Sequence, residues 1–160
     1  MGHLYFAYGS NLRSAQMARI CPGHVFLGPA RLEGYRLAFT LPDAEWRGGV
    51  ADIIESHGDE VWGALYRLTD ADLLPLDAYE GFDPRGPSES NDYARRKIRL
   101  ASTPRDILQA EAWTYFVREP QGHVAPSALY RDVLIEGAIE RGLPAAYIET
   151  MRRTFEGPGR

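Results

Sequence analysis

The stretch Tyr5-Phe6-Ala7-Tyr8-Gly9-Ser10-Asn11-Leu12 carries the strongest structural signal of the chain. Its apolar and aromatic residues predict a buried strand, His3–Tyr8, that ends abruptly in a Gly-Ser-Asn turn. Gly9 permits backbone angles that a side chain would forbid, and Ser10 and Asn11 hydrogen-bond readily to neighbouring backbone groups. Such a turn leaves successive N–H groups free to bind a carboxylate or an oxyanion. An ordinary junction between a strand and a loop has the same local sequence, so both interpretations stay open at this point.

Composition is typical of a soluble globular protein. The chain has 160 residues, 25% of them charged and 44% hydrophobic, and its length fits a single domain over 1–160. A net charge of −4 argues against nucleic acid as a partner, and a solvated strand face explains the one basic cluster, Arg95, Arg96, Lys97 and Arg99. No apolar stretch reaches membrane-spanning length, and the first residues lack a signal-peptide pattern. We therefore expect no membrane partner and a cytoplasmic location.

Cysteine and histidine offer no metal site. The single cysteine excludes an internal disulfide and a cysteine metal cluster. Cys21 lies close to His24, but the intervening Pro22-Gly23 favours a turn over a catalytic thiol–imidazole pair. The four histidines are scattered and match no zinc spacing, so no metal is expected.

Strand patterns fill the first two-thirds of the chain, and helices close it. After the first strand we expect strands over 30–41, 50–55, 60–68, 93–101 and 111–118. The expected helices are 14–20, one capped by Thr69, a second short one from Pro75 to near Glu80, 126–141 and 144–155. Strands first and helices last predict an α+β domain.

Glu80, followed by Gly81 at the predicted end of a helix, is a candidate general base. A glutamate in this position is most often a solvated helix end, so the local pattern also has a plain structural explanation. The C-terminus of a helix disfavours an ionised acid, and the aromatic neighbours Tyr79 and Phe82 could exclude water. Both effects raise the pKa toward the neutral range in which a carboxylate takes and returns protons.

A series of segments resembles the γ-glutamylcyclotransferase family, which has γ-glutamylamine cyclotransferases and AIG2-like proteins as relatives. The early stretch 5–12 resembles the family signature, and 76–81 resembles the segment that carries its catalytic glutamate. The segments 48–51 and 58–63 look like its central strands, and 125–130 with 142–147 look like its closing helices. The resemblance covers nearly the whole chain in the right order. It sharpens the α+β expectation to a small mixed β-barrel flanked by helices.

The resemblance implies an enzyme that cyclises γ-glutamyl amino acids or amines. The α-amine attacks the γ-carbonyl of the same molecule, and the products are 5-oxoproline and a free amino acid or amine. Nucleophile and electrophile belong to one molecule, so no cofactor or metal is implied. In this interpretation Glu80 takes the ammonium proton and passes it to the departing nitrogen. The turn from Gly9 to Leu12 offers backbone N–H donors to the developing oxyanion.

The resemblance also implies a set of substrate-binding residues: Tyr5, Phe6, Ala7, Tyr8, Gly9, Ser10, Asn11, Leu12, Tyr93 and Tyr130. Tyrosines are also common in half-buried cores, so a structural role stays open for each of them. The chain departs from the animal enzyme it resembles in the longer, polar segment 82–92. Arg85 in this segment either meets a carboxylate on the leaving group or lies in solvent, and the leaving group stays undefined.

Other functions are compatible with the same sequence. A binding module on the same barrel would keep a small-molecule pocket without turnover, and a γ-glutamylamine-specific or biosynthetic cyclotransferase would share the chemistry. A glutathione-specific enzyme is less favoured, because that branch resembles this chain less closely. Members of the family include dimers, but no heptad or exposed apolar stripe decides the matter here, so a homodimer stays open.

Overall fold

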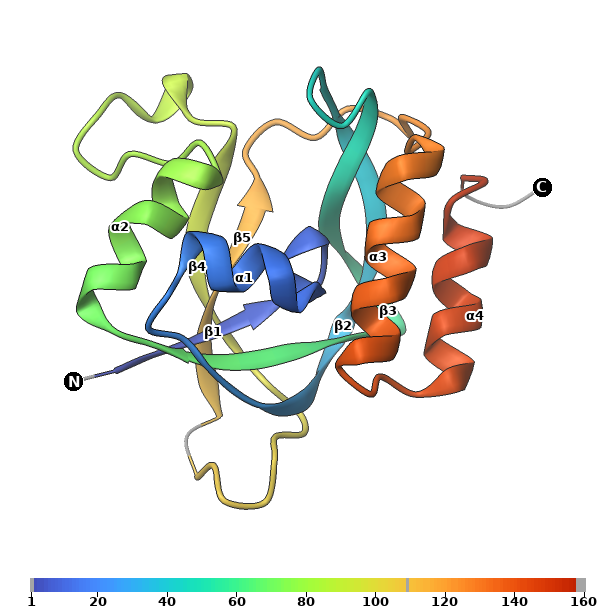
Figure 1. The fold of residues 1–160 in the computed structure, drawn as a ribbon. Coiled ribbons are helices and arrows are strands. Elements are labelled where there is room, and N and C mark those ends of the chain that lie inside the picture. The colour runs from blue at the N-terminus through green and yellow to red at the C-terminus, as the bar shows by residue number, and fades with distance from the viewer. Residues whose placement is uncertain (1, 109, 158–160) are drawn as a thin grey trace.

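The computed structural model describes residues 2–108 and 110–157, and it has an α+β architecture (Figure 1). Its strands are β1 His3–Ala7, β2 Val25–Asp43, β3 Gly48–Leu68, β4 Tyr93–Arg99 and β5 Glu111–Val117. Its α-helices are α1 Ser14–Ile20, α2 Asp70–Tyr79, α3 Ala128–Glu140 and α4 Ala145–Thr154. Two short 3₁₀ helices are η1 Ser10–Leu12 and η2 Ser88–Ser90. The predicted fold class is confirmed.

The strands form one mixed sheet in the order β2-β3-β1-β5-β4. The first strand therefore lies at its centre, antiparallel to β3 and parallel to β5 through the pair Tyr5 and Trp113. Strands covered on both faces carry near-continuous apolar runs. This explains why Tyr5, Phe6 and Ala7 are all buried.

The two edges of the sheet meet and make it a barrel. The backbone N–H of Arg31 in β2 donates to the carbonyl of Ser102 at 3.0 Å, and the N–H of Ala101 donates to the carbonyl of Arg31 at 2.8 Å. The segment after β4 is thus bonded to the opposite edge strand. In Figure 1, α3 and α4 lie side by side along one side of the barrel, and α2 lies on the other.

Two strands are longer than the sequence pattern predicts. β2 begins at Val25 instead of residue 30, and β3 is continuous where we expect a break at the turn His57-Gly58-Asp59. The pairing register shifts between Glu33 and Tyr35, and Gly34 and Gly58 there take φ angles of 83° and 87°. Glycine adopts these angles without strain, so the bulge bends both strands without ending them.

α2 is one helix, and the prediction of two short helices is wrong. Its N-terminus has a capping box in which the Thr69 hydroxyl accepts from the Asp72 N–H at 3.2 Å and the Asp72 carboxylate accepts from the Thr69 N–H at 3.1 Å. Pro75 in its middle removes one backbone donor without breaking it. The burial of Leu76 and Asp77 just beyond holds the second half in place.

The basic cluster on β4 is only partly a solvated face. Lys97 and Arg99 are exposed as expected. The Arg95 side chain is instead only 15% exposed, donates to Asp77 at 3.1 Å and lies 4.7 Å from the ring centroid of Trp113. Its guanidinium therefore serves as a buried partner for an acid of α2. Over residues 2–108 and 110–157, no helix is long and apolar enough to cross a membrane.

Candidate active site

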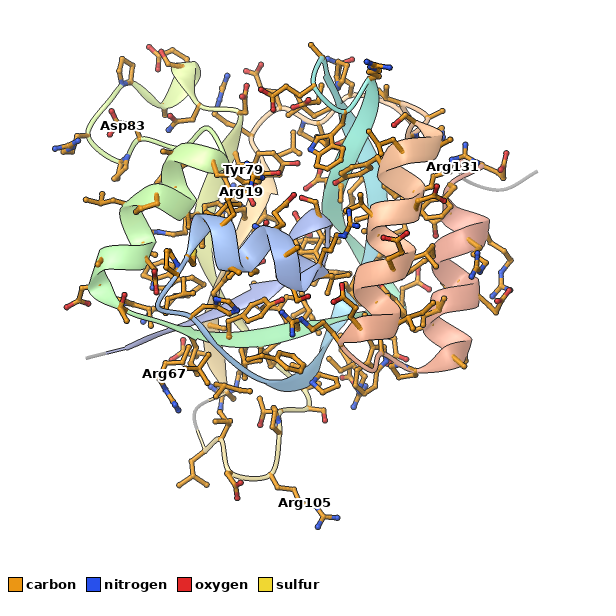
Figure 2. All side chains as sticks on the ribbon, in the orientation of Figure 1. Arg19, Arg67, Tyr79, Asp83, Arg105 and Arg131 are labelled. Atoms are coloured by element: carbon orange, nitrogen blue, oxygen red, sulfur yellow. The ribbon has the colours of Figure 1, made fainter. Side chains whose placement is uncertain are left out.

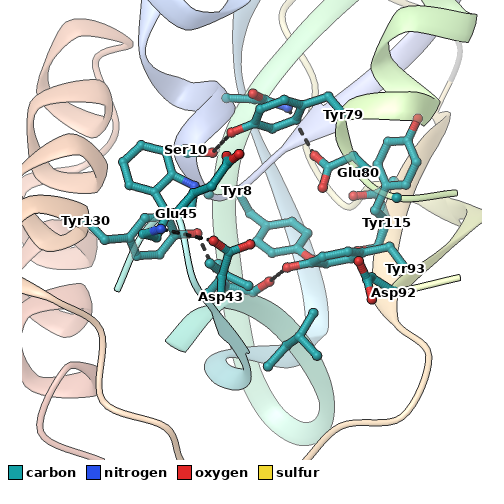
Figure 3. A pocket seen from close by; sticks show the side chains of 18 of the residues that line it. Tyr8, Ser10, Asp43, Glu45, Tyr79, Glu80, Asp92, Tyr93, Tyr115 and Tyr130 are labelled. Carbon is teal, nitrogen blue, oxygen red and sulfur yellow. Dashed lines mark hydrogen bonds between the residues drawn. The ribbon is translucent and has the colours of Figure 1, made fainter. Parts of the chain in front are cut away.

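A cavity of about 430 Å³ opens where β1 ends (Figure 3). Segments far apart in the sequence form its wall: the turn after β1, the turn between β2 and β3, the end of α2, β4, β5 and α3. The residues that line it are Tyr5, Tyr8, Gly9, Ser10, Asn11, Leu41, Asp43, Glu45, Trp46, Val50, Ala51, Ala78, Tyr79, Glu80, Gly81, Asp92, Tyr93, Thr114, Tyr115 and Tyr130.

The turn after β1 presents backbone donors to this cavity. The N–H of Leu12 is already used, because it donates to the carbonyl of Gly9 at 3.0 Å. No acceptor for the N–H groups of Gly9, Ser10 or Asn11 is found in the part of the chain that the structure describes. Consecutive free N–H groups of this kind form a receptor for an anion. The donors are thus 9–11, one residue shorter than the predicted 9–12.

Gly9 lies at a place in the turn with little room for a side chain. Its φ of −118° lies outside the left-handed region, and with a ψ of −135° the residue is also outside the ordinary helical and extended regions. A Cβ added at this position would lie 3.2 Å from the Cβ of Ala51 and 3.5 Å from the hydroxyl of Tyr130. A side chain would therefore crowd the place where the turn, β3 and α3 meet.

The Asn11 side chain joins the turn to the end of α2. Its Nδ2 donates to the Tyr5 hydroxyl at 2.9 Å and to Oε1 of Glu80 at 3.1 Å. Its Oδ1 accepts from Nε2 of Gln16 at 2.7 Å, which fixes the orientation of the amide. Asn11 and Gln16 are both buried. Two segments 69 residues apart are thus tied together by one amide group.

Glu80 is placed by the way α2 ends. The N–H of Phe82 donates to the carbonyl of Asp77 at 2.9 Å, and the N–H of Gly81 donates to the carbonyl of Ala78 at 3.2 Å. This is a Schellman motif, with Gly81 in the left-handed region at φ 66°. The chain reverses at Gly81, and the half-buried Glu80 side chain is left in the cavity wall (Figure 3).

Burial raises the pKa of Glu80 to about 8, and the nearby charge of Asp77 adds to the effect. Both causes disfavour the ionised carboxylate. The upward direction is the one expected from sequence, but Asp77 as a contributor is not visible there. Asp77 is itself buried and accepts from the Tyr115 hydroxyl at 2.6 Å and from Arg95 at 3.1 Å.

Three tyrosine hydroxyls are tied to the backbone around the cavity. Tyr93 donates to the carbonyl of Ala51 at 2.6 Å, and Tyr8 donates to the carbonyl of Tyr115 at 2.5 Å. Tyr130 differs, because its oxygen accepts from the N–H of Ala51 at 3.0 Å. Its own proton has no acceptor among the described residues, so this hydroxyl is free to donate to a ligand.

Phe6, Ala7 and Leu12 are buried beside the cavity but do not line it. A Cβ added at Gly63 would lie 2.8 Å from the ring of Phe6, and one added at Gly137 would lie 2.7 Å from the Cβ of Leu12. These two side chains therefore pack against β3 and α3. The other predicted substrate-binding residues, with Glu80, all line the cavity: Tyr5, Tyr8, Gly9, Ser10, Asn11, Tyr93 and Tyr130.

Sequence reasoning missed several lining residues, chiefly Asp43, Glu45, Trp46, Tyr115 and Asp92. Asp43 ends β2, Glu45 and Trp46 lie in the turn before β3, and no local pattern marks this region as part of a site. Tyr115 lies in an apolar strand where any aromatic residue fits. Only the three-dimensional arrangement brings these side chains to the cavity that Glu80 lines.

The segment 82–92 reaches the cavity only at its end. Asp92 lines the cavity, whereas Arg85 does not: its side chain is 86% exposed and lies 3.7 Å from the carboxylate of Asp83. Figure 2 shows Asp83 at the outer edge of the molecule. The sequence leaves open whether Arg85 meets the leaving group or lies in solvent, and in the structure it lies in solvent.

Cys21 and His24 form no catalytic pair. The His24 ring is hydrogen-bonded to the backbone carbonyl of Cys21 at 2.7 Å, and burial raises the pKa of the Cys21 thiol to about 12. Among the residues described, no group of three or more His, Cys, Asp or Glu side chains could hold a metal ion.

Comparison with known sequences gives a consistent result. A family model described as "Gamma-glutamyl cyclotransferase, AIG2-like" matches residues 5–132. Gamma-glutamylcyclotransferase of Bos taurus is 34% identical over 148 residues, which cover 90% of this chain and 74% of that protein. The protein of the same name from Mus musculus is 33% identical over 153 residues, covering 93% of this chain and 77% of the relative.

Solved structures agree with the sequence comparison. A structure of a gamma-glutamyl cyclotransferase superimposes with a TM-score of 0.83 at 30% identity, covering 95% of this chain and 87% of the other. The human protein loc79017 superimposes with a TM-score of 0.82 at 31% identity, covering 94% and 86%. A yeast cyclotransferase specific to glutathione shares only the fold, with a TM-score of 0.55 at 12% identity over 98% of each chain.

Proposed function

The chain belongs to the gamma-glutamyl cyclotransferase, AIG2-like family, and from this premise we propose that it cyclises a γ-glutamyl amino acid or amine to 5-oxoproline. The reaction releases the free amino acid or amine. The new bond joins the α-nitrogen of the substrate to its γ-carbonyl carbon, and the bond from that carbon to the departing nitrogen breaks.

The cavity suits a substrate that must be held in a curled conformation. Its volume of about 430 Å³ is in the range of small-molecule sites, and its wall contains the rings of Tyr5, Tyr8, Tyr93, Tyr115 and Tyr130. An intramolecular attack in a fixed geometry can lower the barrier by roughly 7–11 kcal/mol. Positioning of the α-amine against the γ-carbonyl is therefore a major part of the catalysis that we assign to the protein.

Glu80 is the proposed general base. Its carboxylate removes a first proton from the α-ammonium of the substrate, which frees the amine to attack. The α-nitrogen loses a second proton as the lactam forms; one of the two protons passes through Glu80 to the departing nitrogen, and the other is released to solvent. A carboxylate with a pKa of about 8 is a stronger base than an ordinary glutamate, and both its protonation states are populated near neutral pH. This supports a residue that must accept and return a proton in each turnover.

The oxyanion that forms at the γ-carbonyl needs hydrogen-bond donors. The free N–H groups of Gly9, Ser10 and Asn11 and the uncommitted hydroxyl proton of Tyr130 are the candidates. A Cβ added at Gly9 would lie 3.5 Å from the Tyr130 hydroxyl, which puts these two donors next to each other. Donors fixed before the reaction stabilise a developing charge without reorganisation.

The observation that carries the proposal is the hydrogen bond of 3.1 Å from Asn11 to Glu80. It brings the proposed base and the proposed anion receptor to one small cavity, although they are distant in the sequence. A base and an oxyanion receptor acting on one carbonyl must lie this close.

To test the proposal, the protein is incubated with γ-glutamyl-alanine and 5-oxoproline is measured over time. We expect turnover by the wild type and a loss of about 10²–10⁴-fold in kcat for Glu80→Gln, the usual range for removal of a general base. Glu89→Gln is the matched control, since Glu89 is exposed and does not line the cavity. Full turnover by Glu80→Gln would show that another group is the base. Thermal stabilisation by 5-oxoproline with no turnover of any γ-glutamyl compound would instead indicate a binding module.

A further inference from the structure

The wall of the cavity is strongly acidic. It contains the carboxylates of Asp43, Glu45 and Asp92 beside the Glu80 carboxyl, and the described residues that line it include no lysine, arginine or histidine. A ligand in this cavity therefore meets a negative field that no cationic side chain of the wall opposes. Concave sites lined by one sign of charge concentrate ligands of the opposite sign.

Two of these carboxylates lie apart from the proposed reaction centre. Asp43 ends β2, and Glu45 follows it in the turn before β3. Figure 3 shows both on the side of Tyr130, whereas Glu80 is on the side of Tyr93. The ammonium of the γ-glutamyl group must lie against Glu80 for its proton to be removed. Asp43 and Glu45 are then left for the part of the substrate that departs.

Asp43 is fixed in its position. Its Oδ1 accepts a hydrogen bond from the backbone N–H of Trp46 at 3.0 Å, and no ion pair to it is found within the described residues. Its charge is felt inside the cavity: burial is the main cause that raises the pKa of the Tyr130 hydroxyl, and the charges of Glu80 and Asp43 contribute. Glu45 is exposed to solvent and also lines the cavity.

We propose that the enzyme prefers γ-glutamyl substrates whose departing amine carries a second positive charge and no carboxylate, as in an alkyl diamine. Asp43 and Glu45 hold the distal cation. This inference rests on the proposed function and specifies its substrate class. A departing amino acid would instead bring its carboxylate into the acidic wall, where no cation of the lining offsets the repulsion.

Three γ-glutamyl amides separate charge from size. The departing amines are 1,4-diaminobutane, pentylamine and 5-aminopentanoate, which share a chain of four methylenes and end in an ammonium, a methyl and a carboxylate. We expect kcat/KM, measured as 5-oxoproline formed at low salt, to be about tenfold higher for the ammonium than for the methyl and lowest for the carboxylate, because two weak ion pairs together give about this factor. The preference should shrink near 1 M salt, where the screening length falls to about 3 Å.

A double variant assigns the preference to the two residues. Asp43→Asn with Glu45→Gln should bring the ammonium-to-methyl ratio close to one. The control, Asp132→Asn with Glu111→Gln, makes the same change of charge at exposed positions outside the cavity wall and should keep the ratio. Asparagine at 43 can still accept from the Trp46 N–H, so the turn keeps its hydrogen bond.

The outcomes separate this inference from the proposed function. Equal use of the three amides by the wild type, or a preference for the carboxylate, would overturn the inference and leave the cyclisation intact. An equal loss of kcat/KM on all three amides in the double variant would also overturn the inference and leave the cyclisation intact. The two charges would then act on the γ-glutamyl group, which the three amides share. The failure of all three amides and of γ-glutamyl-alanine to give 5-oxoproline would contradict the proposed function itself, and the inference would fall with it.

Discussion

At the scale of single residues, the most unusual group is the Glu80 carboxyl, which the protein holds in a site that opposes its ionisation. Its pKa is about 8 in the folded protein, against 4.5 for a free side chain. A carboxyl whose pKa is raised by folding binds its proton more tightly in the native state. The native state is therefore destabilised as the pH rises from the unfolded pKa to the folded one.

This gives a prediction for stability. Between about pH 4.5 and 8 the free energy of unfolding of the wild type should fall relative to that of Glu80→Gln, by on the order of 2–4 kcal/mol. The glutamine keeps an oxygen for the Asn11 amide and does not titrate. Urea unfolding of both proteins at several pH values measures the difference. A difference that is constant with pH would show that Glu80 is not perturbed.

Asp77 should control the pH profile of the reaction. Removal of its charge in Asp77→Asn lowers the pKa of Glu80, so the rising limb of kcat/KM should move to lower pH. The wild-type limb is expected near pH 8. The profile distinguishes this effect from simple damage, which would lower the rate at every pH without moving the limb. A limb that stays in place or moves upward would contradict the role of Asp77.

The two tyrosines that meet Ala51 should differ in function. Tyr130 has a free hydroxyl proton, whereas Tyr93 donates its proton to the carbonyl of Ala51. Tyr130→Phe should reduce kcat by about 10²-fold or more, as for the loss of one oxyanion donor. Tyr93→Phe should mainly cost stability, on the order of 1 kcal/mol, because a buried carbonyl loses its donor. Steady-state kinetics and urea unfolding of both variants make the comparison, and equal effects on kcat would contradict it.

At the scale of secondary structure, the end of α2 decides where the base lies. Gly81 has φ 66°, and a Cβ there would lie 2.8 Å from the carboxylate of Asp92. Gly81→Ala should destabilise the protein by about 1–2 kcal/mol, the cost of the left-handed conformation in other residues. It should also reduce kcat, because the carboxylate of Glu80 loses its position.

α3 provides a matched control for this variant. It too ends in a Schellman motif, with Gly142 at φ 71° and the N–H of Leu143 donating to the carbonyl of Ala138 at 3.0 Å. A Cβ at Gly142 meets nothing within 4 Å, and this residue does not line the cavity. Gly142→Ala should cost similar stability and leave kcat unchanged. A similar loss of kcat in both variants would contradict the claim that Gly81 positions the Glu80 carboxylate.

Local sequence predicts elements well where one signal dominates, and less well where signals compete. The apolar run before Gly9 gives β1 correctly, and the acids after Thr69 mark the start of α2. Pro75 and Gly58 suggest breaks that do not occur. A capping box and buried side chains hold α2 together, and pairing with β2 keeps β3 continuous. These are tertiary effects, which outweigh local preferences.

At the scale of the whole molecule, the site depends on pairings that no local pattern reveals. The parallel pairing of β1 with β5 and the closure of the barrel at Arg31 both join distant segments. The sequence suggests the turn after β1 and Glu80 separately, and the family resemblance links them. The hydrogen bond from Asn11 to Glu80 and the approach of Asp43 to the cavity require the folded barrel.

The most direct test of the central claim is a crystal structure of the protein with 5-oxoproline bound. We predict the lactam in the cavity of about 430 Å³, with a carbonyl or carboxylate oxygen within about 3.2 Å of the N–H groups of 9–11 and its ring nitrogen at a similar distance from the Glu80 carboxyl. 5-Oxoproline bound elsewhere, or bound there with Glu80 turned away from the ring nitrogen, would contradict the claim that the turn and this acid act on one substrate.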